Sequence, residues 1–225
     1  MTLPEGLVAC EDGLVRPTWA ATDLLLRDYY DTEWGSPVTS EQGVFERLVL
    51  ESFQSGLSWS TILKKRQAFR RAFASFVPEA VAAFTDQDRE RLMQDAGIVR
   101  NKRKIDAAMT NAQAVIALRG ALAAESDAHR AGRMGEAPLT HLLRPRQSYP
   151  RHLGELVWLY QPSHQPRPRC AQDVPAQTEE SHALSLELKR RGFVFVGPVT
   201  ALALMSAIGI VNTDILGTWK RPLTK

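Results

Sequence analysis

Apolar residues recur at intervals of three and four along most of the chain, which is the period of an amphipathic helix. No stretch alternates apolar and polar residues for long enough to carry a sheet, and the apolar run 193–196 is too short for one. In the first half, helices are therefore expected over 23–30, from Glu41, after Ser60, after Thr85 and from about Asn101. The pattern predicts an all-α protein.

Local signals set the expected ends of these helices. Thr39 or Ser40 can cap the helix that follows them, and Thr85 can cap a later one. Val77-Pro78 is expected to end the helix after Ser60, because the residue before a proline avoids the helical conformation.

The stretch from about 120 to 175 is rich in proline and glycine, so we expect mostly loop there, with a short helix around 153–160. Thr178 then caps a helix ending at Gly192, and Pro198 opens a last apolar helix that reaches Ile208. Residues 1–16 show no period. The expected organisation is an extension over 1–16 and one body over 17–225, with a loop-rich insertion at about 126–150.

The composition is that of a globular protein rather than a membrane or disulfide-rich one. The chain has 225 residues, 44% of them hydrophobic, which suits a globular protein with a substantial core. No apolar run is long enough for a membrane span, and the first residues lack a secretory pattern, so a cytoplasmic protein without a membrane partner is expected. Cys10 and Cys170 are too few for a disulfide framework or a zinc ribbon.

The formal net charge of +3 is weak support for a polyanionic partner, but the basic residues cluster. Groups lie at 64–71, 100–104 and 189–191, and such clusters can neutralise phosphates. A solvated helix face explains any one cluster at least as well.

A short turn over 95–99, with Gly97 at its centre, separates two predicted helices, and the second helix begins with basic residues. This is typical of a helix-hairpin-helix element, in which glycine allows a tight turn and free amides at the next helix N-terminus face a DNA phosphate. An ordinary packing corner between two helices is the equally weighted alternative.

Glu51 falls on the same side of its helix as Val44, Leu48 and Ser55. A partly buried carboxylate needs compensation, either from a cationic ligand or from a nearby arginine. The residue pattern alone favours the structural ion pair over the ligand.

Aromatic residues gather around Glu51 in the sequence, and planar rings beside a carboxylate suit an electron-poor planar ligand. They are Trp19, Tyr29, Tyr30, Trp34 and Trp59. Rings that only fill the core are the alternative, which we favour for Trp34. We assign Trp59, which follows the turn 56–58, to function.

Four ordered segments, 29–35, 56–59, 95–100 and 189–197, resemble the 3-methyladenine DNA glycosylase I family. The resemblance runs from about Arg16 to Gly217, except for the loop-rich middle, which carries the insertion. It implies a two-lobed helix-hairpin-helix glycosylase fold with a base pocket in the cleft. It also implies excision of N3-methylated adenine from alkylated double-stranded DNA.

The resemblance assigns roles to particular residues. Glu51 becomes the pocket carboxylate that contacts the methylated adenine, and Tyr29, Trp59 and Trp19 become the rings around the base. DNA-binding roles fall to residues of two loops, one that fills the gap left by the extruded nucleotide and one that anchors the backbone: Gly56, Leu57, Gly97, Val99, Arg100 and Lys102.

The chain departs from the family at its zinc site. The four ligand positions are Pro17, Tyr30, Asp214 and Thr218, which do not form a zinc ligand set. We therefore expect no metal and no cofactor, and we expect packing of Tyr30, with hydrogen bonds from Asp214 or Thr218, to hold the termini together. A further pocket tyrosine of the family is Leu26 here.

The expected activity is that of a monofunctional, monomeric glycosylase, with Lys102 and Lys104 contacting phosphate rather than forming a Schiff base. Two alternatives remain open. One is a non-catalytic damaged-DNA-binding protein on the same scaffold. The other is a helix–turn–helix transcription regulator, which needs an exposed recognition helix, whereas the helix after Gly97 is apolar along one face.

Overall fold

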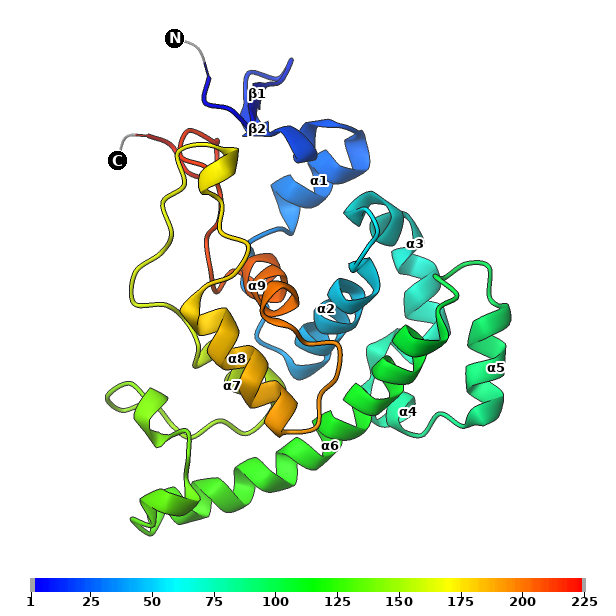
Figure 1. The fold of residues 1–225 in the computed structure, drawn as a ribbon, viewed down its shortest axis with the longest axis vertical. Coiled ribbons are helices and arrows are strands. Elements are labelled where there is room, and N and C mark those ends of the chain that lie inside the picture. The colour runs from blue at the N-terminus through cyan, green and yellow to red at the C-terminus, as the bar shows by residue number, and fades with distance from the viewer. Residues whose placement is uncertain (1–2, 224–225) are drawn as a thin grey trace.

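The computed structural model describes residues 3–223, so the first two residues of the expected extension and the last two of the expected body lie outside the described residues. Helices dominate this part of the chain (Figure 1), and the predicted all-α class is confirmed. The helices are α1 (Leu24–Thr32), α2 (Glu41–Gln54), α3 (Trp59–Ala72), α4 (Pro78–Ala82), α5 (Asp86–Gln94), α6 (Lys102–Arg130), α7 (Leu153–Trp158), α8 (Glu179–Arg190) and α9 (Pro198–Ala207).

Side chains cap these helices much as the sequence predicts. Ser40, rather than Thr39, caps α2 by accepting a hydrogen bond from the amide of Gly43. Thr85 and Thr178 each form a reciprocal capping box, at the start of α5 and of α8. The helix starts are therefore fixed locally, because these hydroxyls satisfy amides that have no partner within the helix.

Two predictions about element boundaries are wrong. Pro78 does not end α3, which stops at Ala72; it starts the extra helix α4, where a proline at the first position loses no hydrogen bond. The loop expected from about 120 begins only after Arg130, because α6 continues to bury apolar side chains along its length.

The expected extension is folded in part. Its strands β1 (Leu7–Ala9) and β2 (Val15–Pro17) pair antiparallel around a turn in which Gly13 has a φ of +79°. Glycine takes this conformation readily. Strands of three residues were too short for the sequence pattern to reveal.

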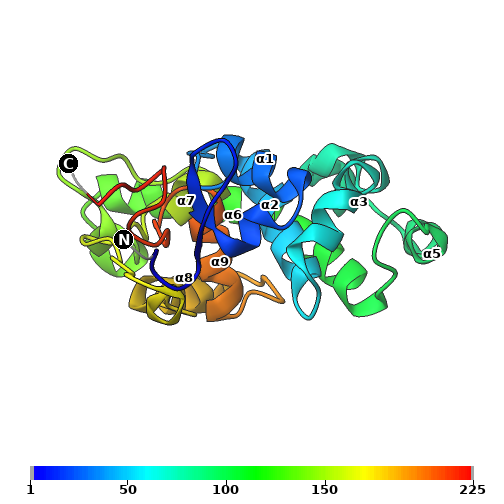
Figure 2. The ribbon, with the colours of Figure 1, turned by 90° about the horizontal axis from the view of Figure 1, so that it is seen from above.

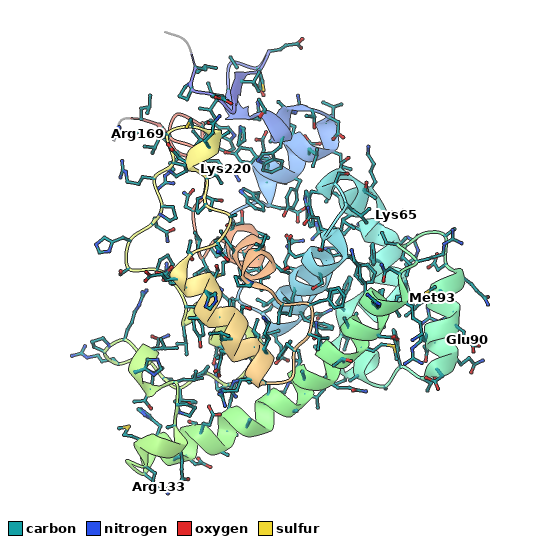
Figure 3. All side chains as sticks on the ribbon, in the orientation of Figure 1. Lys65, Glu90, Met93, Arg133, Arg169 and Lys220 are labelled. Atoms are coloured by element: carbon teal, nitrogen blue, oxygen red, sulfur yellow. The ribbon has the colours of Figure 1, made fainter. Side chains whose placement is uncertain are left out.

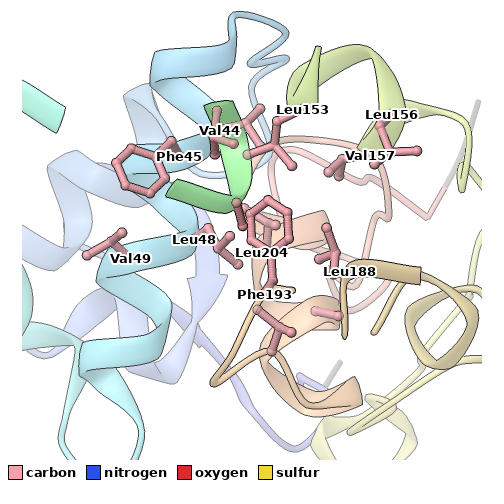
Figure 4. Packing of buried hydrophobic residues seen from close by; sticks show 14 of the residues in the cluster. Val44, Phe45, Leu48, Val49, Leu153, Leu156, Val157, Leu188, Phe193 and Leu204 are labelled. Atoms are coloured by element: carbon pink, nitrogen blue, oxygen red, sulfur yellow. The ribbon is translucent and has the colours of Figure 1, made fainter. Parts of the chain in front are cut away.

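Helix α2 lies at the centre of the fold. It contacts α3 and α6 on one side and α7 and α9 on the other, so two helical lobes meet along it (Figures 1 and 2). Figure 4 shows Val44 and Leu48 of α2 packed with Leu153 of α7 and Leu204 of α9. Because α2 is buried on both flanks, a polar side chain on it is enclosed by the fold. No helix in residues 3–223 has the length and apolar character that a membrane span requires.

Candidate active site

A cavity of about 480 Å³ opens between α2, α3, α9 and the two terminal segments. Its lining includes Trp19, Trp34, Glu51, Gln54, Trp59, Val199, Ser206 and Asp214. A larger hollow of about 710 Å³ lies against α6 and α7, but it contains none of the predicted site residues. Its arginines, Arg119, Arg130 and Arg151, are each paired with a carboxylate, so the smaller cavity is the stronger candidate.

Glu51 is buried in the wall of this cavity, with 5% of its surface exposed. It makes no hydrogen bond or ion pair with any described residue, so the structural ion pair that the sequence favoured is absent within residues 3–223. Burial raises the pKa of Glu51 to about 8, and Arg47, one helical turn earlier, opposes this shift. Arg47 instead donates to Glu33 at 2.7 Å. The carboxyl group is thus left available to whatever enters the cavity.

Trp59 and Tyr29 form an aromatic pair beside Glu51, with ring centroids 5.3 Å apart. Trp59 opens α3, after its cap Ser58, and lines the cavity. Tyr29 is 2% exposed and lies behind this ring rather than in the lining. Burial and the charge of Glu51 raise the pKa of Tyr29, so its hydroxyl stays protonated. Neither that hydroxyl nor the indole N–H of Trp59 has a partner among the described residues, so both donors remain unused.

Trp19 and Trp34 complete the aromatic wall, with ring centroids 5.6 Å apart in an edge-to-face contact. Trp19 lies on a short 3-10 helix and is 37% exposed, so it lines the cavity as expected. The expectation that Trp34 only fills the core is wrong, because its ring also faces the cavity. Leu26 does not reach the cavity lining and packs with Tyr29 and Leu63.

Sequence reasoning did not place Gln54, Ser206, Asp214 and the α9 residue Val199 in the cavity wall. Asp214 is a second buried carboxyl group there, and burial raises its pKa. It lies more than 160 residues from Glu51 in the chain, and no spacing rule links the two. Only the meeting of the C-terminal segment with α2 brings them to one cavity.

The α2–α3 loop presents Leu57 to solvent, with 39% of its surface exposed. Gly56 has a φ of +78°, and the loop is closed by hydrogen bonds between Gln54 and Leu57. The loop therefore holds an apolar side chain outward next to the cavity residue Trp59, as the resemblance implies.

Helices α5 and α6 form the expected hairpin. Gly97 is required there by the packing of the turn against α3, and not by the backbone conformation of a tight turn. A Cβ there would lie 2.9 Å from the Cβ of Ala68 on α3, so close packing rather than a left-handed backbone excludes a side chain. Lys65 of α3, labelled in Figure 3, donates to the carbonyls of Ala96 and Gly97 and fixes the turn.

The amides of Val99 and Arg100 have no acceptor within the part of the chain that the structure describes. They precede the N-terminus of α6, where the helix dipole also favours an anion. Arg100 is exposed, and Lys102 is exposed while paired with Asp106 at 2.7 Å. The arrangement suits one backbone phosphate.

Lys104 is buried and is not available for the DNA phosphate contact that the sequence had led us to expect. It is 8% exposed, and its ammonium donates to the carbonyls of Phe53 at 2.8 Å and Ser55 at 2.5 Å. These carbonyls end α2, so Lys104 caps that helix and cannot serve as a phosphate contact. The prediction was wrong because the sequence did not show that α6 crosses the end of α2.

The zinc positions of the family hold a donor set that does not fit zinc. Pro17 has no side-chain donor atom, and the buried side chains of Tyr30 and Thr218 offer only neutral hydroxyl groups. The ammonium of Lys220 lies 4.8 Å from the centre of the Tyr30 ring, and a second cation there would be repelled. Structural zinc prefers thiolate and imidazole ligands.

Other contacts tie the two termini together. Tyr30 packs edge-to-face against Trp19 and Trp219, which confirms the expected packing, and its hydroxyl lies beside the side chains of Asp214 and Thr218. Arg16, 1% exposed, forms forked hydrogen bonds with Asp12 and Asp31. The indole of Trp219 donates to Asp31 at 3.0 Å, so the C-terminal segment joins this cluster.

Replacing Arg16 with methionine is expected to lower the free energy of unfolding by about 2–3 kcal/mol, because charge-assisted hydrogen bonds to two carboxylates are lost. Denaturant unfolding measures this. The matched control is Arg27→Met on α1, where the arginine side chain is 39% exposed and lies 3.7 Å from the carboxylate of Asp28. Equal stability of the two variants would show that the Arg16 cluster does not hold the termini.

Comparison with known proteins agrees with this geometry. The sequence pattern of the methyladenine glycosylase family matches residues 19–130 and 140–221. The chain is 38% identical to DNA-3-methyladenine glycosylase 1 of Escherichia coli (strain K12) over 202 residues, which is 88% of this chain and 92% of that protein.

Solved structures agree as well. The crystal structure of a 3-methyladenine DNA glycosylase I superposes with a TM-score of 0.71 at 34% identity, covering 89% of this chain and 96% of the other. A variant of 3-methyladenine DNA glycosylase I in complex with 3-methyladenine superposes with a TM-score of 0.72 at 28% identity, covering 89% and 94%. The chain belongs to the methyladenine glycosylase family.

Proposed function

We propose that this protein is a DNA repair glycosylase that excises 3-methyladenine from alkylated DNA by hydrolysing the N-glycosidic bond. The observation that carries the proposal is Glu51, a buried carboxyl group without a protein partner in an aromatic cavity. An adenine methylated at N3 is cationic and planar, so it supplies the missing countercharge and stacks on the rings.

The reaction requires the protein mainly to bind the cationic base and to exclude neutral purines. The cationic base leaves as a neutral molecule, so no strong general acid is needed. The ionised Glu51 and the ring of Trp59 select a cationic purine over a neutral one once the nucleotide has left the stack. Water then attacks the sugar, which has oxocarbenium character. The unused hydroxyl of Tyr29 and indole N–H of Trp59 are donors beside this site.

DNA is held by the two loops described above. The amides near Val99 bind a backbone phosphate, and Leu57 fills the space that the extruded nucleotide vacates. A lyase reaction needs a free amine at the sugar, whereas Lys104 is committed to capping α2, so we propose a monofunctional enzyme. We expect it to act as a monomer in the cytoplasm.

Release of methylated purines from alkylated duplex DNA tests the proposal, with and without a chelator and with strand cleavage monitored. Release of 3-methyladenine that survives chelation, without strand cleavage, is the expected result. Tight binding of the same DNA without release would favour a damage sensor. Sequence-dependent binding without any preference for alkylated DNA would favour a transcription regulator.

The pH dependence of excision follows from Glu51. Its carboxyl group, with a pKa of about 8, is neutral below that pH, and the neutral form cannot balance the charge of the base. We therefore expect kcat/KM for 3-methyladenine release to rise about tenfold per pH unit up to about pH 8 and then level off. Excision rates between pH 6 and pH 9.5 at constant ionic strength measure this, and a flat profile would contradict it.

A further inference from the structure

The α8–α9 loop, residues 192–197, presents two apolar side chains to solvent. Val194 is 40% exposed and Phe195 is 43% exposed. Phe195 also has a φ of +56°, in the left-handed region that a residue with a bulky side chain rarely adopts. An exposed aromatic ring on strained backbone persists only where the surrounding structure imposes it.

Buried polar side chains from three helices hold this loop. Asn111 of α6 donates to the carbonyl of Val194 at 3.0 Å and accepts from its amide at 2.8 Å. Ser52 of α2 shares its hydroxyl proton between the carbonyl of Leu48 at 2.8 Å and that of Phe195 at 3.2 Å, and Ser185 of α8 donates to the carbonyl of the residue after Phe195 at 2.6 Å. All three side chains are at most 3% exposed. The core is thus organised to keep the ring of Phe195 pointing outward.

The loop leads directly into α9, which lines the base cavity, and it contacts the last turn of α2, which precedes the loop that carries Leu57. Val199, in the first turn of α9, lines the cavity and is 59% exposed. Ser52, which contacts Phe195, lies in the last turn of α2, and the loop that carries Leu57 begins where α2 ends. Both loops project from the same side of the molecule (Figure 2). Leu57, Val194 and Phe195, which we call the apolar rim, therefore lie on two loops that each lead directly into a helix lining the cavity.

We propose that Phe195 is a second DNA-inserting side chain, which stacks on a base beside the extruded nucleotide from the lobe opposite Leu57. The inference rests on the proposed function, because extrusion of a nucleotide leaves neighbouring bases unstacked. A flat ring covers any such base regardless of its identity, as an enzyme that finds lesions in any sequence requires. Continuity with the cavity mouth favours duplex DNA over a protein partner as the occupant of this rim.

The variant Phe195→Gly tests the inference with little risk to the fold, since glycine adopts the observed φ without strain. We expect binding of a duplex with a central abasic-site analogue to weaken between about 5-fold and about 150-fold, the range set by the loss of one base–aromatic stack. Binding of free 3-methyladenine, followed by tryptophan fluorescence, should not change. Phe195→Trp should restore duplex binding. Leu186→Ala on α8, where the leucine is 55% exposed, is the matched control and should bind as the wild type does.

The outcomes separate the inference from the function on which it rests. Wild-type duplex affinity in a folded Phe195→Gly variant overturns the inference, as does equal weakening in Leu186→Ala. A change of oligomeric state on removing the ring, with duplex affinity retained, also overturns it and assigns the rim to self-association. Phe195-dependent binding of the abasic duplex by a wild type that releases no base would support the inference while the proposed function fails.

Discussion

Replacing Glu51 with glutamine is expected to reduce release of 3-methyladenine from alkylated duplex DNA at least about 100-fold at pH 8.5. Glutamine keeps the size of the side chain but cannot become an anion. The cationic base then enters an aromatic cavity without a countercharge, and the developing charge on the sugar is not balanced. Single-turnover excision measures the loss. The control is Glu90→Gln, an exposed carboxylate on α5 (Figure 3), which should retain full activity.

The same substitution should stabilise the protein at alkaline pH. Glu51 ionises near 4.5 as an ordinary side chain and near 8 in the fold, so the folded state binds more protons between these values. Its contribution to stability is complete below about pH 4.5 and is lost as the pH rises through about 8. Glu51→Gln lacks this loss, and its melting temperature should exceed that of the wild type at pH 8.5 by more than at pH 5. An inactive variant that is less stable at pH 8.5 would instead indicate a general folding defect.

Replacing Gly154 with alanine is expected to destabilise the protein by about 3 kcal/mol or more. Gly154 lies in the first turn of α7, and a Cβ there would overlap the backbone carbonyl of Thr39. The carbonyl cannot move freely, because α7 also binds the adjacent backbone through the indole of Trp158, which donates to Val38 at 2.8 Å. Relief requires separating α7 from the start of α2, which opens the core. Thermal unfolding should show a fall of about 6–12 °C.

Gly120 provides the matched control for this prediction. It lies in α6 with no atom within 4 Å of an added Cβ. Gly120→Ala should raise stability by about 0.5–1 kcal/mol, because alanine loses less conformational entropy in a helix. If both alanine variants unfold at the wild-type temperature, the close approach of α7 to Thr39 is not as tight as the structure has it.

The sequence predicted most of the helices because their signals are local. Ser40, Thr85 and Thr178 satisfy amides within three residues, and the apolar period marks each buried face. The same reasoning failed at Pro78 and at the end of α6, because a proline can start a helix as well as end one, and because a helix continues wherever a neighbouring element covers its apolar face.

The candidate site also combines features that the sequence revealed with features that it did not. A carboxylate on the buried side of α2 and aromatic residues at nearby positions could be read from the chain, since both follow from helical periodicity and ring chemistry. Three facts could not: Glu51 has no partner among the described residues, Tyr29 lies behind Trp59, and Lys104 caps α2.

The sequence by itself thus determined the helical class, most caps and the residue types of the pocket. Only the tertiary structure decided which polar groups are paired, that Asp214 joins Glu51 in one cavity, and that three buried side chains hold the loop that carries Phe195. The physical reason is the distance along the chain over which each interaction acts. Caps and periodicity act over a few residues, whereas pairing, burial and electrostatic shifts depend on elements that meet only when the two lobes close on α2.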